Sequence, residues 1–192
     1  MIRRPSRAVI AAAVAAVLCP AGAWAEPLPG LSKPAHRAAW RALLHWPSSC
    51  ERSWRQAGAA TAGIQAWRTS GGAHVVAVDC FLGAYQGASM LYVLSPSRKA
   101  TGPIRLRIYE DPGTGAPKPM GRTTITGLVT FHPKNGRLTV FEKSRGLGDC
   151  GIYSVFRLRG GAFVPMVARA KTSCDGKPPF DPTRWPKLPL PR

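Results

Sequence analysis

The glycine-rich bend at residues 145–151, RGLGDCG, restricts what this chain can fold into more than any other segment. Three of its residues are glycines, and glycine accepts positive φ values without steric cost. The flanking segments, 137–143 and 151–158, have the composition of β-strands. The bend therefore predicts a tight loop between two strands, with a structural role for Gly146, Gly148, Asp149 and Gly151.

Arg145 and Asp149 lie four residues apart in this bend, and two interpretations of them stay open. In the first, the guanidinium and the carboxylate brace the bend, or Asp149 accepts backbone N–H groups as a turn residue. In the second, the backbone forms a nest of N–H groups beside Arg145, and the nest holds an anionic group. Arg145 is therefore a candidate anion-binding residue.

Short strand-like segments separated by local turns fill the chain beyond residue 58. In the clearest of them, 104–108, apolar residues alternate with Arg105 and Arg107, which is typical of a half-buried strand. Asn135-Gly136 and Gly160-Gly161 are typical of tight hairpins, and Pro165 favours an edge position for the last strand. Residues 110–120 are expected to form a long loop. The sequence predicts about seven strands, at residues 73–80, 89–94, 104–109, 123–131, 137–143, 151–158 and 162–169.

One helix is predicted before the strands. Ser32-Lys33-Pro34 resembles a helix start, and Pro47 is expected to end the helix. Its alanine-rich face is expected to pack on the sheet, and the opposite, exposed face is expected to carry His36, Arg37, Arg41 and His45. The predicted fold class is α+β and mostly β: an antiparallel meander with one N-terminal helix packed on it and two disulfides.

The N-terminus resembles a secretory signal peptide. A basic start is followed by an apolar run over residues 8–18 and by the small-x-small pattern Ala23-Trp24-Ala25. Cleavage near Ala25 places the mature chain in the periplasm or outside the cell, and no later segment is long and apolar enough to span a membrane. The expected organisation is a signal peptide at 1–25, one disulfide-stapled domain at 26–176, and a proline-rich tail at 177–192.

Four cysteines follow the predicted signal peptide, and an even number in an oxidising compartment indicates two disulfides. The favoured pairs are Cys150–Cys174, whose separation suits neighbouring strands, and Cys50–Cys80, which ties the helical region to the sheet. The alternative, Cys80–Cys150 with Cys50–Cys174, stays open. A nucleophilic role for Cys150 is disfavoured, because the adjacent Asp149 would raise the pKa of the thiol and no histidine lies in a cysteine-hydrolase context.

Two segments resemble a known family of exported bacterial proteins. They are the bend at 145–151 with its flanking strands, and the segment Val78-Asp-Cys-Phe-Leu-Gly-Ala-Tyr85. Together they resemble the family called domain of unknown function 1176. The resemblance covers the chain from about Cys50 to its end. It implies a family and a compartment, but no particular activity.

No catalytic residue, metal site or cofactor is predicted. The chain has no Cys-x-x-Cys pair and no His-x-x-x-His pair. Gly146-x-Gly148-x-x-Gly151 has the letters of a dinucleotide-binding motif, but it lies between two strands and not before a helix. An enzyme is therefore the less favoured class.

The chain is strongly basic, with 27 Lys and Arg against 9 Asp and Glu, and a formal net charge of +18. Three of these arginines lie in the predicted signal peptide, so the mature chain would carry about +15. Such a charge favours an anionic partner, and export argues against nucleic acid. The leading hypothesis is a non-enzymatic module that binds an anionic envelope polymer, lipid head groups or an acidic protein. The alternative is an inhibitor of an envelope-attacking hydrolase. The candidate anion-binding residues are Arg145, Arg105, Arg107 and Arg157.

Overall fold

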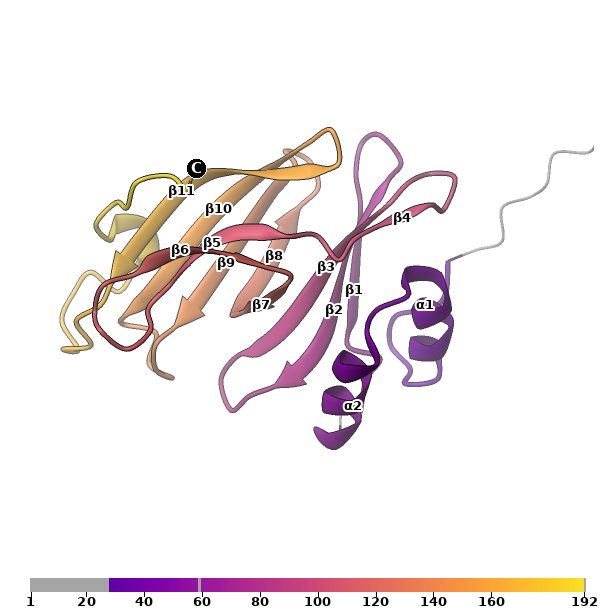
Figure 1. Cartoon of the computed structure of the whole chain (residues 1–192), viewed down its shortest axis with the longest axis horizontal. Coiled ribbons are helices and arrows are strands. Elements are labelled where there is room, and N and C mark those ends of the chain that lie inside the picture. Colours follow the sequence, from indigo (N-terminus) through magenta and orange to yellow (C-terminus); the bar gives the residue numbers. More distant parts are fainter. Residues whose placement is uncertain (1–27, 59, 192) are drawn as a thin grey trace, which may run out of the picture.

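The computed structural model describes residues 28–58 and 60–191, and the predicted signal peptide lies outside these residues. Within them, two helices precede eleven strands and a short 3-10 helix (Figure 1). The elements are α1 (His36–Leu44), α2 (Ser48–Gln56), β1 (Ile64–Arg68), β2 (His74–Leu82), β3 (Gly87–Leu94), β4 (Ala100–Thr101), β5 (Leu106–Glu110), β6 (Lys118–Arg122), β7 (Thr124–Thr126), β8 (Leu128–His132), β9 (Arg137–Lys143), β10 (Gly151–Arg159), β11 (Ala162–Lys171) and η1 (Pro182–Arg184).

The expectation of a single helix was wrong. Helix α1 ends before Pro47 as predicted, and His45 closes it in a left-handed conformation. Pro47 then takes an extended ψ of 147° and acts as the N-cap of α2, so the chain re-enters helix at Ser48. A proline is well tolerated at a helix start because its missing N–H would have no partner there.

The strands of the described residues pair antiparallel, as expected, but they form three sheets instead of one continuous meander. The first sheet has the order β1-β2-β3-β4, and β7 also pairs with β3. The second has the order β11-β10-β9-β8, and β5 and β6 form a separate two-stranded ribbon. This ribbon passes in front of the four-stranded sheet in the view of Figure 1.

The predicted strands at the C-terminal side agree best with the structure. Strand β9 has the predicted bounds. Strand β10 ends one residue later than predicted and β11 two residues later. Strand β11, which contains Pro165, lies at a sheet edge as expected. The prediction missed β1, β4 and β6, the last of which begins inside the expected 110–120 loop. It also merged β7 and β8, which Gly127 separates with a φ of 123°.

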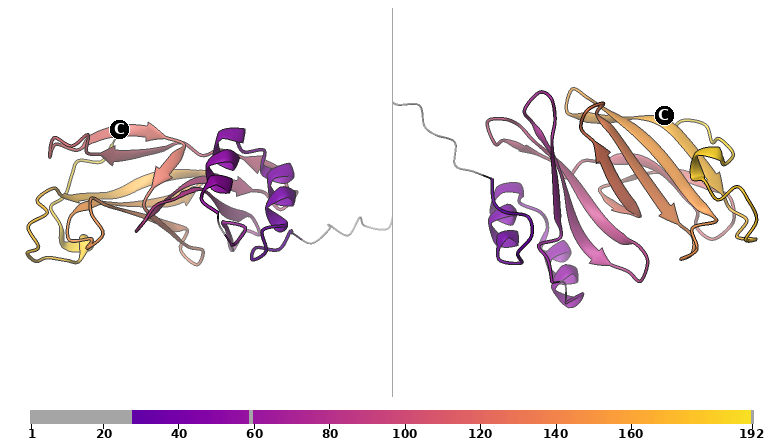
Figure 2. Two further views of the ribbon diagram at one scale, coloured as in Figure 1. Left: turned by 90° about the horizontal axis from the view of Figure 1, so that it is seen from below. Right: turned by 180° about the vertical axis from the view of Figure 1, so that it is seen from behind.

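Two hydrophobic cores lie on opposite faces of the first sheet. On one face the helices pack through Trp40, Leu44 and Trp46 against Val76 and Val78. On the other face Val75, Ala77, Leu91 and Val93 meet β5 and the four-stranded sheet through Leu106, Ile108, Leu138 and Phe156. The left panel of Figure 2 shows both helices at the end of the molecule away from the four-stranded sheet. Strand β2 thus buries both faces, which is why its residues do not show a simple alternation.

Both favoured disulfides are present, Cys50–Cys80 and Cys150–Cys174. The segment predicted as a proline-rich tail packs on the body, where Trp185 is fully buried and its ring meets Phe141 edge-on at 5.6 Å. The right panel of Figure 2 shows this segment, in yellow, beside the four-stranded sheet. No helix among the described residues has the length and apolar character needed to cross a membrane.

Candidate functional site

The bend at 145–151 is closed by a bidentate ion pair. Arg145 Nε donates to Asp149 Oδ1 at 2.8 Å, and Arg145 Nη2 donates to Oδ2 at 2.6 Å. Asp149 Oδ2 also accepts the backbone N–H of Gly176 at 2.9 Å, which fastens the bend to the segment after Cys174. Gly151 has a φ of 144°, and a Cβ there would lie 2.1 Å from the carbonyl oxygen of Glu142. The bend therefore requires glycine at this position.

This geometry supports the structural interpretation of Arg145 and Asp149. The carboxylate is almost fully buried, and the hydrogen bonds from Arg145 hold the pKa of Asp149 well below its ordinary value. The guanidinium directs its Nε and one Nη group at the carboxylate, and 40% of the Arg145 side chain is exposed. The Asp149 carboxylate therefore already neutralises the charge of Arg145, which argues against Arg145 as an anion-binding residue.

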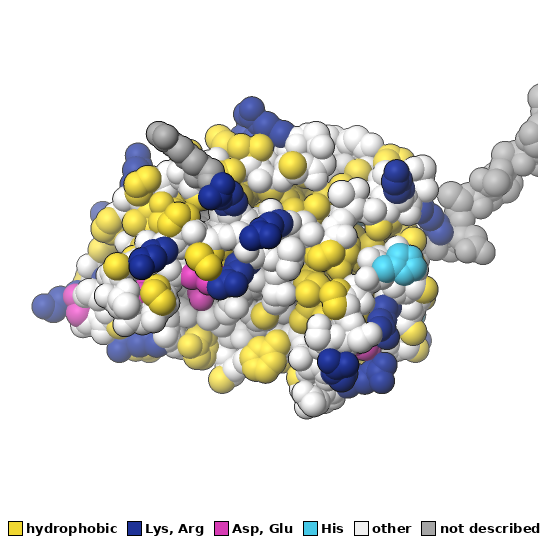
Figure 3. All heavy atoms as spheres, viewed as in Figure 1, with side chains coloured by type: hydrophobic (Ala, Val, Ile, Leu, Met, Phe, Trp, Pro, Cys, Tyr) yellow, Lys and Arg dark blue, Asp and Glu magenta, His cyan; other side chains and the backbone are white. Residues whose placement is uncertain are grey.

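The structure does not bring the strand arginines together. Arg105 and Arg107 project from the ribbon on the side away from Leu106 and Ile108, and the Arg105 guanidinium lies over Gly121. Arg157 alternates with the core residue Phe156, so it points away from the face of β10 on which β5 packs. In Figure 3, which shows the side covered by the ribbon, the blue Lys and Arg side chains are scattered and some adjoin magenta acids. The four candidate residues therefore do not form one patch.

A different basic region lies where four turns meet, at the upper edge of Figure 1. We call it the turn end; it comprises the turns at 69–73, 95–99, 133–136 and 160–161 and the strand residues next to them. Segments 68–74, 95–99, 132–137 and 157–161 contain no Asp or Glu. They do contain Arg68, Arg98, Lys99, Lys134, Arg137, Arg157 and Arg159.

A hollow of about 410 Å³ opens between three of these turns. Its walls are mostly glycine and small polar residues, with Lys134 among them. Arg68 and Lys134 line a second hollow of about 360 Å³ that shares Thr69 and Pro133 with the first. Such a concave, cationic and acid-free surface attracts anions, because nothing within it offsets the positive potential.

The opposite ends of the strands form the loop end, which comprises residues 81–86 and 144–150. Large apolar side chains are exposed on both loops: Phe81 (52%), Leu82 (44%), Tyr85 (45%) and Leu147 (79%). The first loop is fastened next to the second, because the Gln86 side chain donates to O of Lys143, the last residue of β9, at 3.0 Å and accepts from Lys143 N at 2.8 Å. Hydrophobic side chains are visible in Figure 3 along the lower edge, where the β2–β3 hairpin ends.

A hollow of about 470 Å³ adjoins the loop end, and its charged lining residues are Asp111, Glu142 and Lys143. Burial, and then the neighbouring charge of Glu110, raise the pKa of Glu142 to about 7. The other two acids are engaged elsewhere: Asp111 Oδ1 accepts three backbone N–H groups of its own loop, and Glu110 pairs with Arg122. Among the described residues no three His, Cys, Asp or Glu side chains are placed to bind a metal ion.

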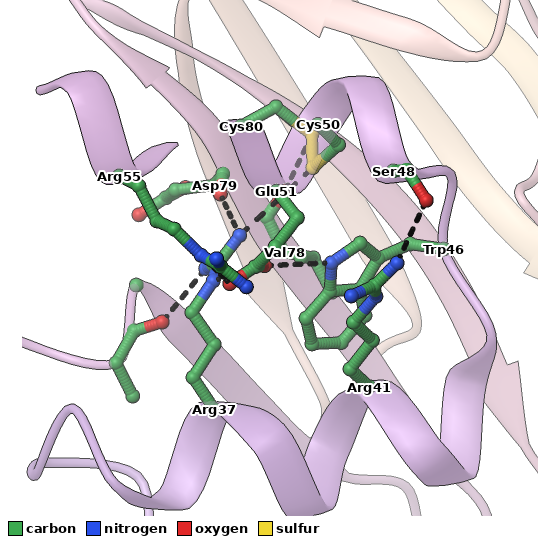
Figure 4. Close-up of polar contacts among 12 residues, drawn as sticks. Arg37, Arg41, Trp46, Ser48, Cys50, Glu51, Arg55, Val78, Asp79 and Cys80 are labelled. Carbon is green, nitrogen blue, oxygen red and sulfur yellow. Dashed lines mark hydrogen bonds and ion pairs between the residues drawn. A yellow bond between two sulfur atoms is a disulfide. The ribbon is translucent and has the colours of Figure 1, made fainter. Parts of the chain in front are cut away.

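A buried charged cluster lies beneath the helices, and the sequence interpretation missed it (Figure 4). Arg37, expected on the exposed face, is only 4% exposed. Its Nε donates to Glu51 Oε2 at 2.8 Å, and its Nη groups donate to the carbonyl oxygens of Ala62 and Asp79 at 2.8 and 3.0 Å. Burial acts to raise the pKa of Glu51, but hydrogen bonds from Arg37 and Trp46 outweigh it and lower the pKa. The fully engaged donors and acceptors make this cluster a structural element of the fold.

Comparison with known proteins agrees with the resemblance seen in the sequence. The family described as "Protein of unknown function (DUF1176)" matches residues 3–188. A protein of Escherichia coli K12, described as "Uncharacterized protein YpfG", is 31% identical over 114 residues, which are 58% of this chain and 30% of that protein. The chain therefore spans less than a third of the length of this relative. No solved structure matches. Because the family match extends over nearly the whole chain, the protein belongs to the DUF1176 family.

Proposed function

We propose that the protein is an exported, non-enzymatic binding module whose turn end binds an anionic component of the bacterial envelope. The observation that carries the proposal is the set of basic side chains around the turn-end hollows, without an Asp or Glu in the same segments. The overall charge also favours an anionic partner, since the chain has a net charge of +18, or about +15 without the predicted signal peptide. Two disulfides suit an oxidising compartment outside the cytoplasm.

The test is a sedimentation assay with vesicles that contain phosphatidylglycerol, against vesicles of phosphatidylcholine alone. Binding to the anionic vesicles is expected to weaken as salt rises, because released counterions supply much of the free energy of binding. The variant Arg68→Ser/Lys134→Ser removes two charges from the turn end and is expected to weaken binding at least tenfold.

The matched control is Arg105→Ser/Arg107→Ser, which also removes two exposed charges but from the ribbon. It is expected to change affinity by no more than about twofold, because these arginines lie at the ribbon and not in the turn-end segments, and salt screens exposed charges. Equal losses in the two double variants would mean that only net charge matters, and no binding at low salt would refute the proposed function.

Inhibition of an envelope-attacking hydrolase is the second candidate, and the loop end favours it. Exposed aromatic and aliphatic side chains on two loops that are connected by hydrogen bonds suit insertion into a partner's cleft. The charge is less favourable, because attacking lysozymes are usually basic and would be repelled. Initial rates of a purified lysozyme with the mature protein and with its Leu147→Asp variant test this candidate, which requires inhibition by the first and little by the second.

A further inference from the structure

A row of basic side chains crosses the outer face of the four-stranded sheet within the turn end. His132 on β8 is paired with Arg137 on β9, and Arg137 is paired with Arg157 on β10. Directly paired residues share one face of a sheet, and their Cβ atoms are about 5 Å apart. The neighbours Leu138 and Phe156 point into the core, so the row points outward.

This row is electrostatically unfavourable in the isolated protein. Like charges directly opposite one another destabilise a pair of strands. Among the described residues, neither Arg137 nor Arg157 forms an ion pair with a carboxylate. The adjacent row inward consists of Thr130, Thr139, Val155 and Val167, none of which offsets the charge.

Arg137 is also the one described residue with a buried side-chain polar atom that lacks a partner. Its Nη2 donates to the hydroxyl of Tyr153 at 2.9 Å, but its Nε is enclosed without any acceptor. Leaving a buried donor unsatisfied is destabilising, and such a group in a native protein calls for an explanation such as a bound ion. Arg37 shows the contrast, since its Nε and both its Nη groups reach acceptors in the fold.

We propose that Arg137 and Arg157, together with His132, form a discrete subsite for one phosphate group. The guanidinium of arginine presents parallel N–H donors that match two oxygens of a phosphate. A free phosphate or a phosphate monoester has more than two terminal oxygens, so it bridges Arg137 and Arg157, whereas one carboxylate has only two. On binding, the Arg137 side chain turns its unsatisfied donor toward the anion. This inference rests on the proposed function, because it places a phosphate of the ligand within the turn end.

The test is an NMR titration that follows the Nε–Hε signals of arginine in the mature, disulfide-bonded protein. Two probes separate the sources of phosphate: inorganic phosphate, and dihexanoyl phosphatidic acid, a water-soluble lipid whose head group is a phosphate monoester. Saturable shifts of the Arg137 and Arg157 signals are expected, while those of Arg105 and Arg107 stay unchanged. Acetate at equal ionic strength is the control for screening and is expected to give no saturable shift.

The variant Arg157→Gln keeps a hydrogen-bonding side chain but removes the charge. The dissociation constant for phosphate, measured from the shift of the Arg137 signal, is expected to rise at least tenfold. Arg107→Gln is the matched control and is expected to leave binding unchanged; unaltered amide spectra establish that both variants are folded. Shifts with the lipid alone support the subsite with a lipid source, and shifts with inorganic phosphate support it for free phosphate.

Absence of saturable shifts at Arg137 with both probes, or equal shifts with acetate, overturns the subsite. If anionic vesicles still bind through Arg68 and Lys134 in that case, the proposed function stands and only the subsite is wrong. If the vesicles do not bind either, the proposed function itself has failed.

Discussion

Two arginine–carboxylate pairs accompany the two disulfides, and they differ in how the protein surrounds them. Arg37–Glu51 lies beside Cys50–Cys80, and the two side chains are 5% and 11% exposed. Arg145–Asp149 lies beside Cys150–Cys174, with a carboxylate that is 1% exposed and an arginine that is 40% exposed. The first pair joins two helices, whereas the second closes a loop across four residues.

The difference shows that the number of hydrogen-bonding partners a charged side chain needs increases with its burial. The buried Arg37 guanidinium requires an acceptor for each nitrogen, and it also lies within 5.0 Å of the ring centroids of Trp46 and Trp54. Arg145 keeps contact with water, so one carboxylate is enough to position it. Deep burial of a charge makes the whole set of partners necessary, because desolvation of an unpaired ion is very unfavourable.

The substitution Arg37→Met is expected to have the largest effect on stability. It leaves Glu51 buried without its main partner, and breaking a buried pair typically destabilises by about 3–5 kcal/mol. Urea denaturation gives the free energy of unfolding. The control is Arg41→Met on the same helix, whose Nη2 donates to the exposed Ser48 hydroxyl. It is expected to change this free energy by under about 1 kcal/mol. Similar losses in both variants would mean that Arg37 acts through helix formation alone.

Acid is expected to weaken the second pair in a predictable pH range. The pKa of Asp149 is lowered in the folded state, so its contribution is present above its ordinary pKa of 3.8 and is lost as the pH falls below that value. Asp149→Asn should be less stable than the parent at pH 7, and the difference between the two should shrink from pH 4 to pH 3. The urea midpoints of both proteins over this pH range measure the difference in stability. A difference that stays constant between pH 4 and pH 3 would contradict the role given to Asp149.

The smallest effect is expected at the periphery of the first cluster. Arg55 donates to Glu51 Oε1 at 3.3 Å, but 73% of its side chain is exposed. Exposed pairs of this spacing on a helix contribute about 0.3–0.5 kcal/mol and are screened by salt. Arg55→Ala should therefore lower the free energy of unfolding by about this amount at low salt and by less in 1 M NaCl. A loss above about 1 kcal/mol at low salt would place Arg55 within the buried network.

The sequence predicted the fold best where the signals are local. The turns Asn135-Gly136 and Gly160-Gly161 and the bend at 145–151 enclose β9, β10 and β11, whose positions were predicted closely. Strand β6 was missed because Pro119 and Gly121 disfavour a strand, and pairing with β5 overrides that preference. For the candidate site, the i,i+4 spacing of Arg145 and Asp149 was visible, but the row formed by His132, Arg137 and Arg157 required the register of three strands.

The sequence by itself determined the family, the mostly antiparallel β-structure and the favoured disulfide pairs, because motifs, periodicity and turn residues act over short distances. Only the tertiary structure decided which charges share a surface. Alternation predicted that Arg105, Arg107 and Arg157 point outward, but Arg157 lies on the face opposite the ribbon that carries the other two. The tertiary structure also decided that Arg37 is buried, since the partners that compensate its charge come from α2, from Ala62 and from β2. Burial of a polar group depends on partners distant in the chain, and no local pattern specifies where they will meet.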